Sequence, residues 1–342
     1  MKEEFLYYKT VLSNNFKSLF SSKALKVDLK DKKIYVMLAA NYPNLGDLAI
    51  TESQLLFLKD NFPDYKIVCV YVSDTLSEYR NIKKSLNKDD IFTLIGGGNN
   101  GDLYEFIESN RRFLLSKFRK NKIVSFPQSV VFSKDSIFKR KFIKLAKQNK
   151  NSYFFAREKQ SYDRYENMNI ENTFLVPDIV FYYEKYIKKS KLSDKSGVSF
   201  IFRNDKEKSM SNSYENMFLE EIKNRKLDYV YADTCDIVYN DNRLELLNNF
   251  INNLSQKKLV ITDRLHGMIL AYITDTPCIV IDNNNHKIKS TYDTWLKNQN
   301  FIKMINSKEE IPKLIDELLK LKKIEKEDLS KYYKNLLSIL NK

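Results

Sequence analysis

The sequence of 342 residues lacks the features that define several common protein classes. It has no apolar run near the roughly 20 residues that a membrane-spanning helix requires, and its first residues lack the basic-then-apolar order of a signal peptide. Its three cysteines lie far apart without a CxxC pair, which argues against a disulfide framework and a zinc site. We therefore expect a cytoplasmic protein, with peripheral contact at the inner membrane face as an open alternative.

Several catalytic motifs are missing as well. No GK[ST] is present to form a P-loop, no GxSxG to form a nucleophile elbow, and no HExxH to bind zinc. No Asp-x-Asp pair occurs either, so the usual metal ligands of many nucleotide-sugar transferases are absent. We expect neither a metal site nor a cofactor.

Positive charge is present in excess. Lysine and arginine total 58 against 44 acidic residues, for a net charge of +14. Such a charge suits nucleic acid, anionic lipid or a phosphorylated substrate, and a general bias towards lysine and asparagine explains it equally well. Because no nucleic-acid-binding motif accompanies the charge, we expect no nucleic-acid partner. The oligomeric state is not indicated.

Short apolar segments alternate with helical patterns along most of the chain. Continuous apolar strands are typical of parallel sheets covered by helices on both faces. The charged stretch 184–195 reads as a linker, which places an N-terminal α/β domain at 1–185 and a C-terminal one at 196–342. We therefore predict two doubly wound Rossmann-like domains facing a cleft, with helices over 3–20 and 311–340. The predicted strands are 34–38, 66–72, 91–95, 122–126, 153–156, 173–176, 198–202, 259–262 and 278–282.

Ligands of open α/β sheets bind beyond the carboxyl ends of the strands, and the turn after Thr262 is the most specific of these ends. Asp263 is placed to cap the next helix, with Arg264 and His266 in its first turn, where free N–H groups and the helix dipole favour an anion. Arg264 adds a bidentate fork, and His266 is one of two histidines able to move a proton near neutral pH. The alternative is that Arg264 pairs with a carboxylate and His266 is a core residue.

Other strand ends add candidates of each chemical type. Arg157 and Arg203 each close an apolar strand and supply further positive charge, while a surface ion pair is the alternative role. Gly97 and Gly98 allow close backbone approach to a ligand, or a structural turn. Gly46 suits a tight turn before a helix capped by Asp47, and His286 suits a solvated loop. The candidate acceptors for sugar hydroxyls are Asn44, Asp47, Asn99, Asp178 and Asp205.

Six of these segments, in this order, resemble the polysaccharide pyruvyl transferase family. They are Asn41 to Ile50, Ile95-Gly-Gly-Gly98, Phe126-Pro-Gln-Ser129, Ala156-Arg-Glu158, Val176-Pro-Asp178 and Thr262-Asp-Arg-Leu-His-Gly267. The resemblance implies a fold similar to GT-B glycosyltransferases, phosphoenolpyruvate as donor and formation of a pyruvate ketal on a sugar. It also implies donor contacts from Arg157, or from Arg203 in its place, and from Arg264, Leu265 and His266.

The resulting hypothesis is transfer of pyruvate to a sugar of a cell-surface polysaccharide or its lipid-linked precursor. His266 serves as general acid, Arg264 and a second arginine hold the donor, and Gly97 and Gly98 supply backbone contacts. Asn44, Asp47, Asn99 and Asp178 face the acceptor. Two other functions stay open: a metal-independent glycosyltransferase that uses a nucleotide sugar, and a non-catalytic protein that binds an anionic polymer or membrane surface.

Overall fold

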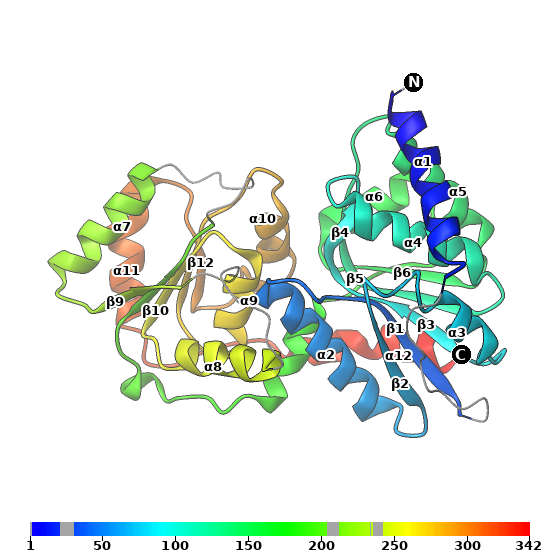
Figure 1. Cartoon of the computed structure of the whole chain (residues 1–342). Helices are drawn as coiled ribbons and strands as arrows, with labels where there is room; N and C mark the ends of the chain where they lie inside the picture. Colours follow the sequence, from blue (N-terminus) through cyan, green and yellow to red (C-terminus); the bar gives the residue numbers. More distant parts are fainter. Residues whose placement is uncertain (1, 21–30, 204–211, 233, 235–241) are drawn as a thin grey trace. The chain divides into compact units, whose positions relative to one another are not determined.

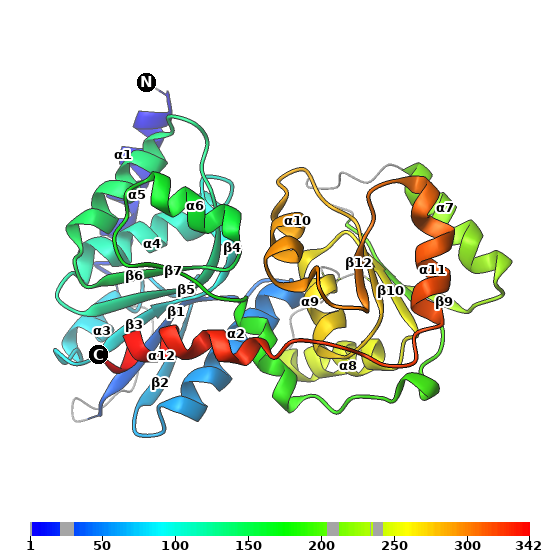
Figure 2. The ribbon, with the colours of Figure 1, turned by 180° about the vertical axis from the view of Figure 1, so that it is seen from behind.

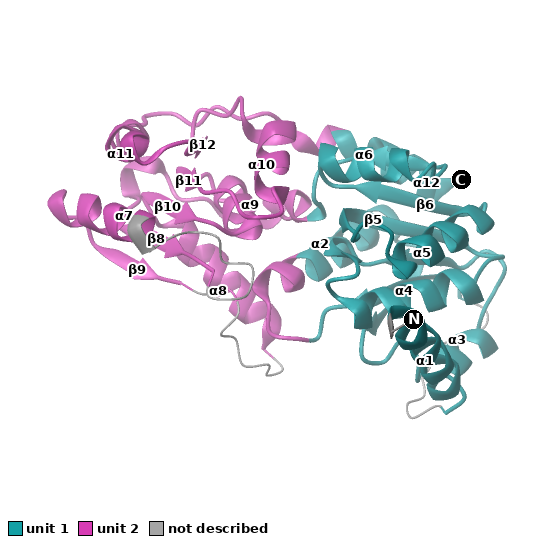
Figure 3. Cartoon of the chain, turned by 90° about the horizontal axis from the view of Figure 1, so that it is seen from above, with its two compact units in different colours: residues 1–41, 50–179, 332–342 teal, residues 42–49, 180–331 magenta. Residues whose placement is uncertain are grey.

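The computed structural model describes residues 2–20, 31–203, 212–232, 234 and 242–342. The chain divides into two compact units (Figure 3). Unit 1 comprises Met1–Asn41, Ile50–Ile179 and Tyr332–Lys342, and unit 2 comprises Tyr42–Ala49 and Val180–Lys331. Each unit is built around one parallel β-sheet.

Unit 1 contains a seven-stranded sheet in the order β2-β1-β3-β5-β6-β7, with β4 paired to β5, and all its strand pairs are parallel. Helices α1, α4, α5 and α6 cover one face, and α2 and α12 lie on the other (Figures 1 and 2). The strands are β1 (Lys33–Ala39), β2 (Lys66–Tyr71), β3 (Ile91–Leu94), β4 (Gly97–Gly101), β5 (Lys122–Val131), β6 (Ser152–Ala156) and β7 (Thr173–Leu175). The helices are α1 (Lys2–Lys17), α2 (Leu45–Asn61), α3 (Tyr79–Lys84), α4 (Glu105–Lys117), α5 (Ile137–Gln148), α6 (Lys159–Asn167) and α12 (Lys334–Asn341).

Unit 2 contains a five-stranded parallel sheet in the order β12-β11-β10-β8-β9. Its strands are β8 (Val198–Ile201), β9 (Tyr229–Tyr231), β10 (Leu259–Thr262), β11 (Cys278–Val280) and β12 (Ile302–Met304). Its helices are α7 (Asn212–Asn224), α8 (Arg243–Ser255), α9 (Leu265–Ile273), α10 (Lys287–Thr291) and α11 (Ile311–Leu319). A π-helical turn follows at Tyr292–Leu296, and 3₁₀ turns occur at Ile179–Tyr186, Leu192–Asp194, Lys308–Glu310 and Leu329–Tyr333.

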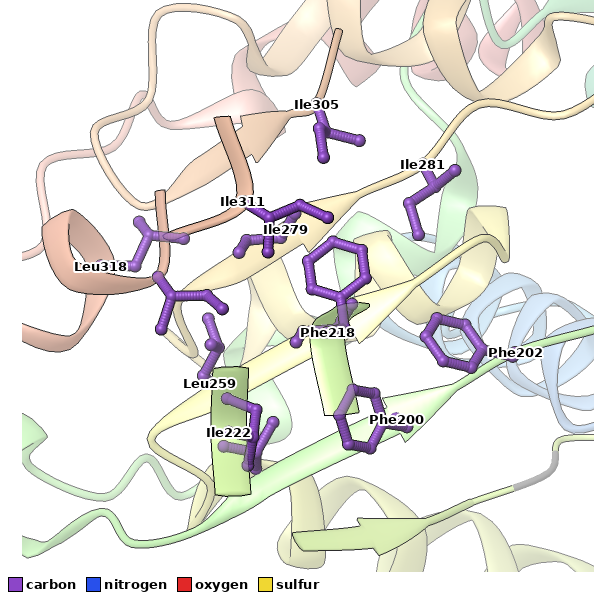
Figure 4. Packing of buried hydrophobic residues seen from close by; sticks show 13 residues of the cluster. Phe200, Phe202, Phe218, Ile222, Leu259, Ile279, Ile281, Ile305, Ile311 and Leu318 are labelled. Carbon is purple, nitrogen blue, oxygen red and sulfur yellow. The ribbon is translucent and has the colours of Figure 1, made fainter. Parts of the chain in front are cut away.

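The core of unit 2 follows from the two-residue period of its strands. Phe200, Leu259 and Ile279 point to one face, where they meet Phe218 of α7 and Ile311 of α11, all fully buried (Figure 4). Residues at the alternate strand positions, such as Thr262, therefore point to the opposite face, where α9 packs on β10. The side chain of Thr262, at the end of β10, therefore points towards the start of α9.

The prediction of parallel α/β sheets is confirmed, and every predicted strand is present within a few residues of its predicted bounds. Three strands were missed. The strand β4 consists entirely of glycine and asparagine, which have low strand propensity. The strands β9 and β12 have three residues each, and Lys303 interrupts the apolar run of β12. The predicted closing helix is two helices, α11 and α12, separated by residues 320–333.

The division between the units differs from the predicted linker. The chain passes from unit 1 to unit 2 at Ile179 and Val180, and the charged stretch 184–195 belongs to unit 2. There Lys189 pairs with Glu184 and with Asp275, and Lys195 is buried. Charged residues of this stretch therefore make contacts within unit 2, so the stretch is not a free linker. In the part of the chain that the structure describes, no helix is long and apolar enough to cross a membrane.

Candidate functional site

Each sheet has one topological switch point, where ligands of doubly wound folds bind. In unit 1 the chain leaves the neighbouring strands β1 and β3 in opposite directions, and in unit 2 it does so at β8 and β10. The segment after β10 carries Asp263, Arg264 and His266, and the segment after β8 carries Arg203. The structure therefore brings Arg203 and the Asp263–His266 turn together within unit 2.

The Asp263–His266 turn is held by hydrogen bonds to the strands that precede it. The Oγ1 of Thr262 donates to the carbonyl of Ile201 at 2.7 Å and accepts from the backbone N–H of Arg264 at 3.0 Å. Asp263 does not cap α9, which corrects the prediction: α9 begins at Leu265, and Arg264 occupies the capping position without a side-chain cap. The Oδ1 of Asp263 instead accepts the backbone N–H of Arg203 at 2.7 Å, because the sheet places the ends of β8 and β10 side by side.

The two charged side chains of this turn, Asp263 and Arg264, are buried. Arg264 is 7% exposed, and its Nε donates to the carbonyl of Phe202 at 3.3 Å. The carboxylate of Asp263 is fully buried, and burial raises its pKa above the usual value, against the opposing effects of the Arg203 N–H and the charges of Arg264 and Arg203. The hydrogen bond to Phe202 and the nearby charge of Asp263 favour one orientation of the Arg264 guanidinium.

His266 lies where the first turns of two helices meet. It is half-buried in the first turn of α9, and its ring packs against Gly46 in the first turn of α2. A side-chain carbon added at Gly46 would lie 2.1 Å from the Nδ1 of His266, so glycine is needed for this approach. The N-terminal ends of α2 and α9, which carry the positive ends of the helix dipoles, therefore both lie beside His266, an arrangement that favours an anion.

The residue that caps α2 is Asn44 and not Asp47, which corrects the prediction. The Oδ1 of Asn44 accepts the backbone N–H of Asp47 at 3.1 Å, so Asn44 caps α2 and Asp47 lies in its first turn. Gly46 is helical and does not form a tight turn. The backbone N–H of Leu45 donates to the carbonyl of Thr234 at 2.8 Å within unit 2. Asn44 and Asp47, two of the predicted acceptor residues, are thus close in sequence to Gly46, which contacts His266.

A second polar cluster lies in unit 1 around Arg157. The Nη1 of Arg157 pairs with Asp178 at 2.8 Å and its Nε donates to Ser129 at 2.7 Å, with both charged side chains at most 1% exposed. Ser129 also donates to Glu158 at 2.9 Å. Burial raises the pKa of Glu158, and the charge of Arg157 is the first influence that opposes the rise. A buried ion pair, not a surface one, therefore joins one predicted donor residue to one predicted acceptor residue.

The glycine segment after β3 forms β4, which pairs with β5. Gly97 has a φ of 109°, in the region that favours glycine. The side chain of Asn99 is buried and its Oδ1 accepts from Arg111 at 2.5 Å, while Arg111 also pairs with Glu108 at 2.7 Å. Asn99 thus anchors β4 to α4, and Gly98 in β4 is half-buried.

Sequence reasoning missed Thr262, Gly46 as the contact of His266, and Asn283. Asn283 lies three residues after β11, its side chain is 3% exposed, and neither its amide oxygen nor its amide nitrogen has a hydrogen-bond partner in the described structure. Buried amides are nearly always satisfied, so Asn283 is a further candidate for a ligand contact at this end of the sheet. Its position directly after a strand was the available signal.

The remaining candidates fall outside this group. His286 is exposed, as predicted, and its Nδ1 lies 2.6 Å from the carboxylate of Asp282. Asp205 lies outside the described residues. Within the described ranges, no three His, Cys, Asp or Glu side chains are grouped as metal ligands would be.

Comparisons with known proteins agree with the motifs. The family model described as polysaccharide pyruvyl transferase matches residues 44–285. General stress protein 30 of Bacillus subtilis (strain 168) is 34% identical over 322 residues, which span 90% of this chain and 92% of that protein. Pyruvyl transferase 1 of Schizosaccharomyces pombe (strain 972 / ATCC 24843) is 27% identical over 283 residues, 78% of this chain and 70% of that protein. A solved α-glucosyltransferase in complex with UDP and DNA superposes with a TM-score of 0.51 at 11% identity, over 91% of this chain and 95% of that one, a likeness in fold to GT-B glycosyltransferases.

Proposed function

The chain belongs to the polysaccharide pyruvyl transferase family, and from this membership we propose that it transfers pyruvate from phosphoenolpyruvate to a sugar of a cell-surface polysaccharide or its lipid-linked precursor. The observation that carries the proposal is the junction of the first turns of α2 and α9 at His266, beside Arg264. Phosphoenolpyruvate carries a phosphate and a carboxylate, and two helix N-termini with an arginine fork match such a dianion.

His266 is the general acid in this proposal. It gives its proton to the methylene carbon of the donor, which generates an oxocarbenium-like centre at the adjacent carbon. One sugar hydroxyl forms a bond to that carbon and loses its proton, and phosphate leaves as the bond from carbon to phosphate oxygen breaks. A second hydroxyl then bonds to the same carbon and loses its proton, which closes the ketal ring. Of the two hydroxyl protons, one restores the acid form of His266 and the other leaves with phosphate. General acid catalysis is typically worth roughly 10²–10⁴-fold.

Arg264 anchors the donor, and a second arginine binds its other anionic group. Arg157 and Arg203 are the two candidates for this second role. In unit 1, Ser129 and Asp178 hold the side chain of Arg157 in one orientation. In unit 2, the backbone N–H of Arg203 donates to Asp263, which precedes Arg264. Conversion of each arginine to lysine keeps the positive charge but removes the bidentate guanidinium. Phosphoenolpyruvate should then raise the melting temperature less in the variant that has lost the donor-binding arginine.

The remaining candidates take supporting roles in the proposal. Leu265 is buried at the first position of α9 and keeps the backbone N–H groups of that turn in place. The backbone of Gly97 and Gly98 contacts the donor. On the acceptor side, Asp47 and Asp178 accept sugar hydroxyl groups. Asn44 caps the helix turn that carries Asp47, and Asn99 anchors β4 through Arg111.

The central test compares His266→Ala with His286→Ala, which removes the other, exposed histidine. Phosphate release from phosphoenolpyruvate in the presence of acceptor should fall by roughly 10²–10⁴-fold in the first variant and stay unchanged in the second. Phosphoenolpyruvate should still raise the melting temperature of His266→Ala, whereas Arg264→Ala should lose that stabilisation. Because arginine and histidine supply the charge and the proton, EDTA should leave the rate unchanged.

Two results would overturn the proposal. Near-normal turnover by His266→Ala with unchanged donor affinity removes the general-acid assignment. Release of a nucleoside diphosphate from a nucleotide sugar, without phosphate release from phosphoenolpyruvate, assigns the chain instead to glycosyl transfer, since the fold alone does not fix the donor.

A further inference from the structure

Helix α1 exposes apolar side chains on one face, which is unusual for a helix of a globular domain. Phe5, Tyr8, Leu12 and Phe16 follow one another at spacings of three or four residues, so they form one stripe. Their side chains are between 47% and 72% exposed. Leu19 and Phe20, directly after the helix, are also at least half exposed. Scattered exposed apolar residues are ordinary, but a contiguous patch marks an interaction surface.

The opposite face of α1 already packs on unit 1. Tyr7 is buried in a cluster with Ile137 and Phe138 at the start of α5, and the guanidinium of Arg112 in α4 lies 5.5 Å from the Tyr7 ring. Thr10 donates to Glu105 at 3.2 Å. The helix is therefore fixed to its unit by a mixed polar face, and its more apolar face points away from the protein. Packing inside the unit does not explain the stripe.

Basic side chains flank the stripe along a groove between α1, α3 and α4. The groove has a volume of about 980 Å³, and Leu12, Phe16 and Leu19 line it on the α1 side. The other side carries Arg80, Lys83, Lys84 and Lys117, all exposed, and none of the described residues that line the groove is acidic. Within the described chain, none of these four cations is ion-paired with a carboxylate. Figure 3 shows α1, α3 and α4 together in unit 1.

We propose that this surface, composed of the apolar stripe of α1 and the four cations of α3 and α4, docks unit 1 on a bilayer that contains anionic lipids. A helix in the membrane interface buries an apolar face at the headgroup boundary while basic residues meet lipid phosphates. Phenylalanine and leucine supply the first part, and a tyrosine at the edge is typical of the interface. Each lysine or arginine near an anionic surface raises the partition constant about fivefold.

The charge of the surface decides between a membrane and a second copy of the chain. In a symmetric dimer the same patch would face itself and bring two sets of four cations together, without carboxylates to balance them. An anionic bilayer supplies the complementary charge. The inference rests on α1, α3 and α4 alone, and it does not depend on pyruvyl transfer.

The test is co-sedimentation of the full chain with vesicles of phosphatidylcholine, with and without phosphatidylglycerol, at two salt concentrations. We expect binding to the anionic vesicles that weakens as salt screens the charges. Leu12→Gln should reduce it about tenfold through the lost apolar burial, and the pair Lys83→Gln and Lys84→Gln should reduce it roughly 30-fold.

Matched controls separate this surface from the general positive charge of the chain. Leu244→Gln changes another exposed leucine, on α8, which is 46% exposed against 71% for Leu12. The pair Lys322→Gln and Lys323→Gln removes the same charge in unit 2. These controls should bind as the parent chain does. Absence of vesicle binding, or equal losses in variants and controls, overturns the proposal. A dimer in light scattering that Leu12→Gln converts to monomer assigns the surface to self-association instead.

Discussion

At the residue scale, the space beside His266 is set by the missing side chain of Gly46. Replacement of Gly46 by alanine would place a carbon 2.1 Å from the Nδ1 of His266, so the ring must move. Since a displacement of about 1 Å at a reacting group can lower a rate roughly 100-fold, we predict a loss of that order in phosphate release. The melting temperature should change little, because alanine favours the helix.

A double-mutant cycle separates this effect from any other role of Gly46. If Gly46 acts by positioning His266, the variant with both Gly46→Ala and His266→Ala should be as active as His266→Ala alone. A further loss of the same factor in the double variant would show that Gly46 acts on something other than the histidine.

At the element scale, Lys195 joins the carboxyl ends of two helices of unit 2. Its ammonium donates to the carbonyl of Ser255 at the end of α8, to the carbonyl of Thr274 after α9 at 3.2 Å, and to the hydroxyl of Thr276 at 3.0 Å. Lys195→Met leaves these acceptors without their donor, so we predict a fall in the free energy of unfolding of roughly 1–3 kcal/mol, measured by urea titration. Lys191→Met, at an exposed position nearby, is the control and should have no effect.

The same lysine predicts a pH dependence. Burial lowers the pKa of Lys195 to about 8 from an ordinary value of 10.5. Between these two values the unfolded chain binds a proton that the folded chain does not, so the free energy of unfolding should rise with pH across that window, by up to about 3 kcal/mol. The rise should be absent in Lys195→Met. An identical pH profile in the parent chain and this variant would contradict the assignment.

At the element scale, the sequence could predict only features that leave a pattern among neighbouring residues. Apolar strands and the polar turns after them are local features, so the parallel sheets, the strand ends and the Arg264–His266 turn could be predicted. Contacts between distant residues could not. Neither the bond from Arg203 to Asp263 nor the approach of Gly46 to His266 leaves a local signal, because each joins positions far apart in the chain. For the same reason Asp263 was wrongly expected to cap α9.

At the scale of the whole molecule, the two units exchange segments. Residues 42–49 belong to unit 2 although they lie between parts of unit 1, and α12 belongs to unit 1 although it follows unit 2 in sequence. The hydroxyl of Tyr333 donates to the carbonyl of Asp178 at 2.5 Å, and its ring packs on Phe57 of α2. A linear division of the sequence could not show this, because the apolar face of a terminal helix does not specify the sheet on which it packs.

This exchange can be tested with two matched cavities. Leu336 in α12 and Leu318 in α11 are both at most 1% exposed, and both lie in the C-terminal part of the chain. Each change to alanine should lower stability by roughly 2–5 kcal/mol. Hydrogen exchange should show faster exchange in β1 and β5 for Leu336→Ala, and in β8 and β10 for Leu318→Ala, because each helix supports a different sheet. If Leu336→Ala instead loosened β8 and β10, α12 would belong to unit 2, and a single division near residue 190 would describe the chain better.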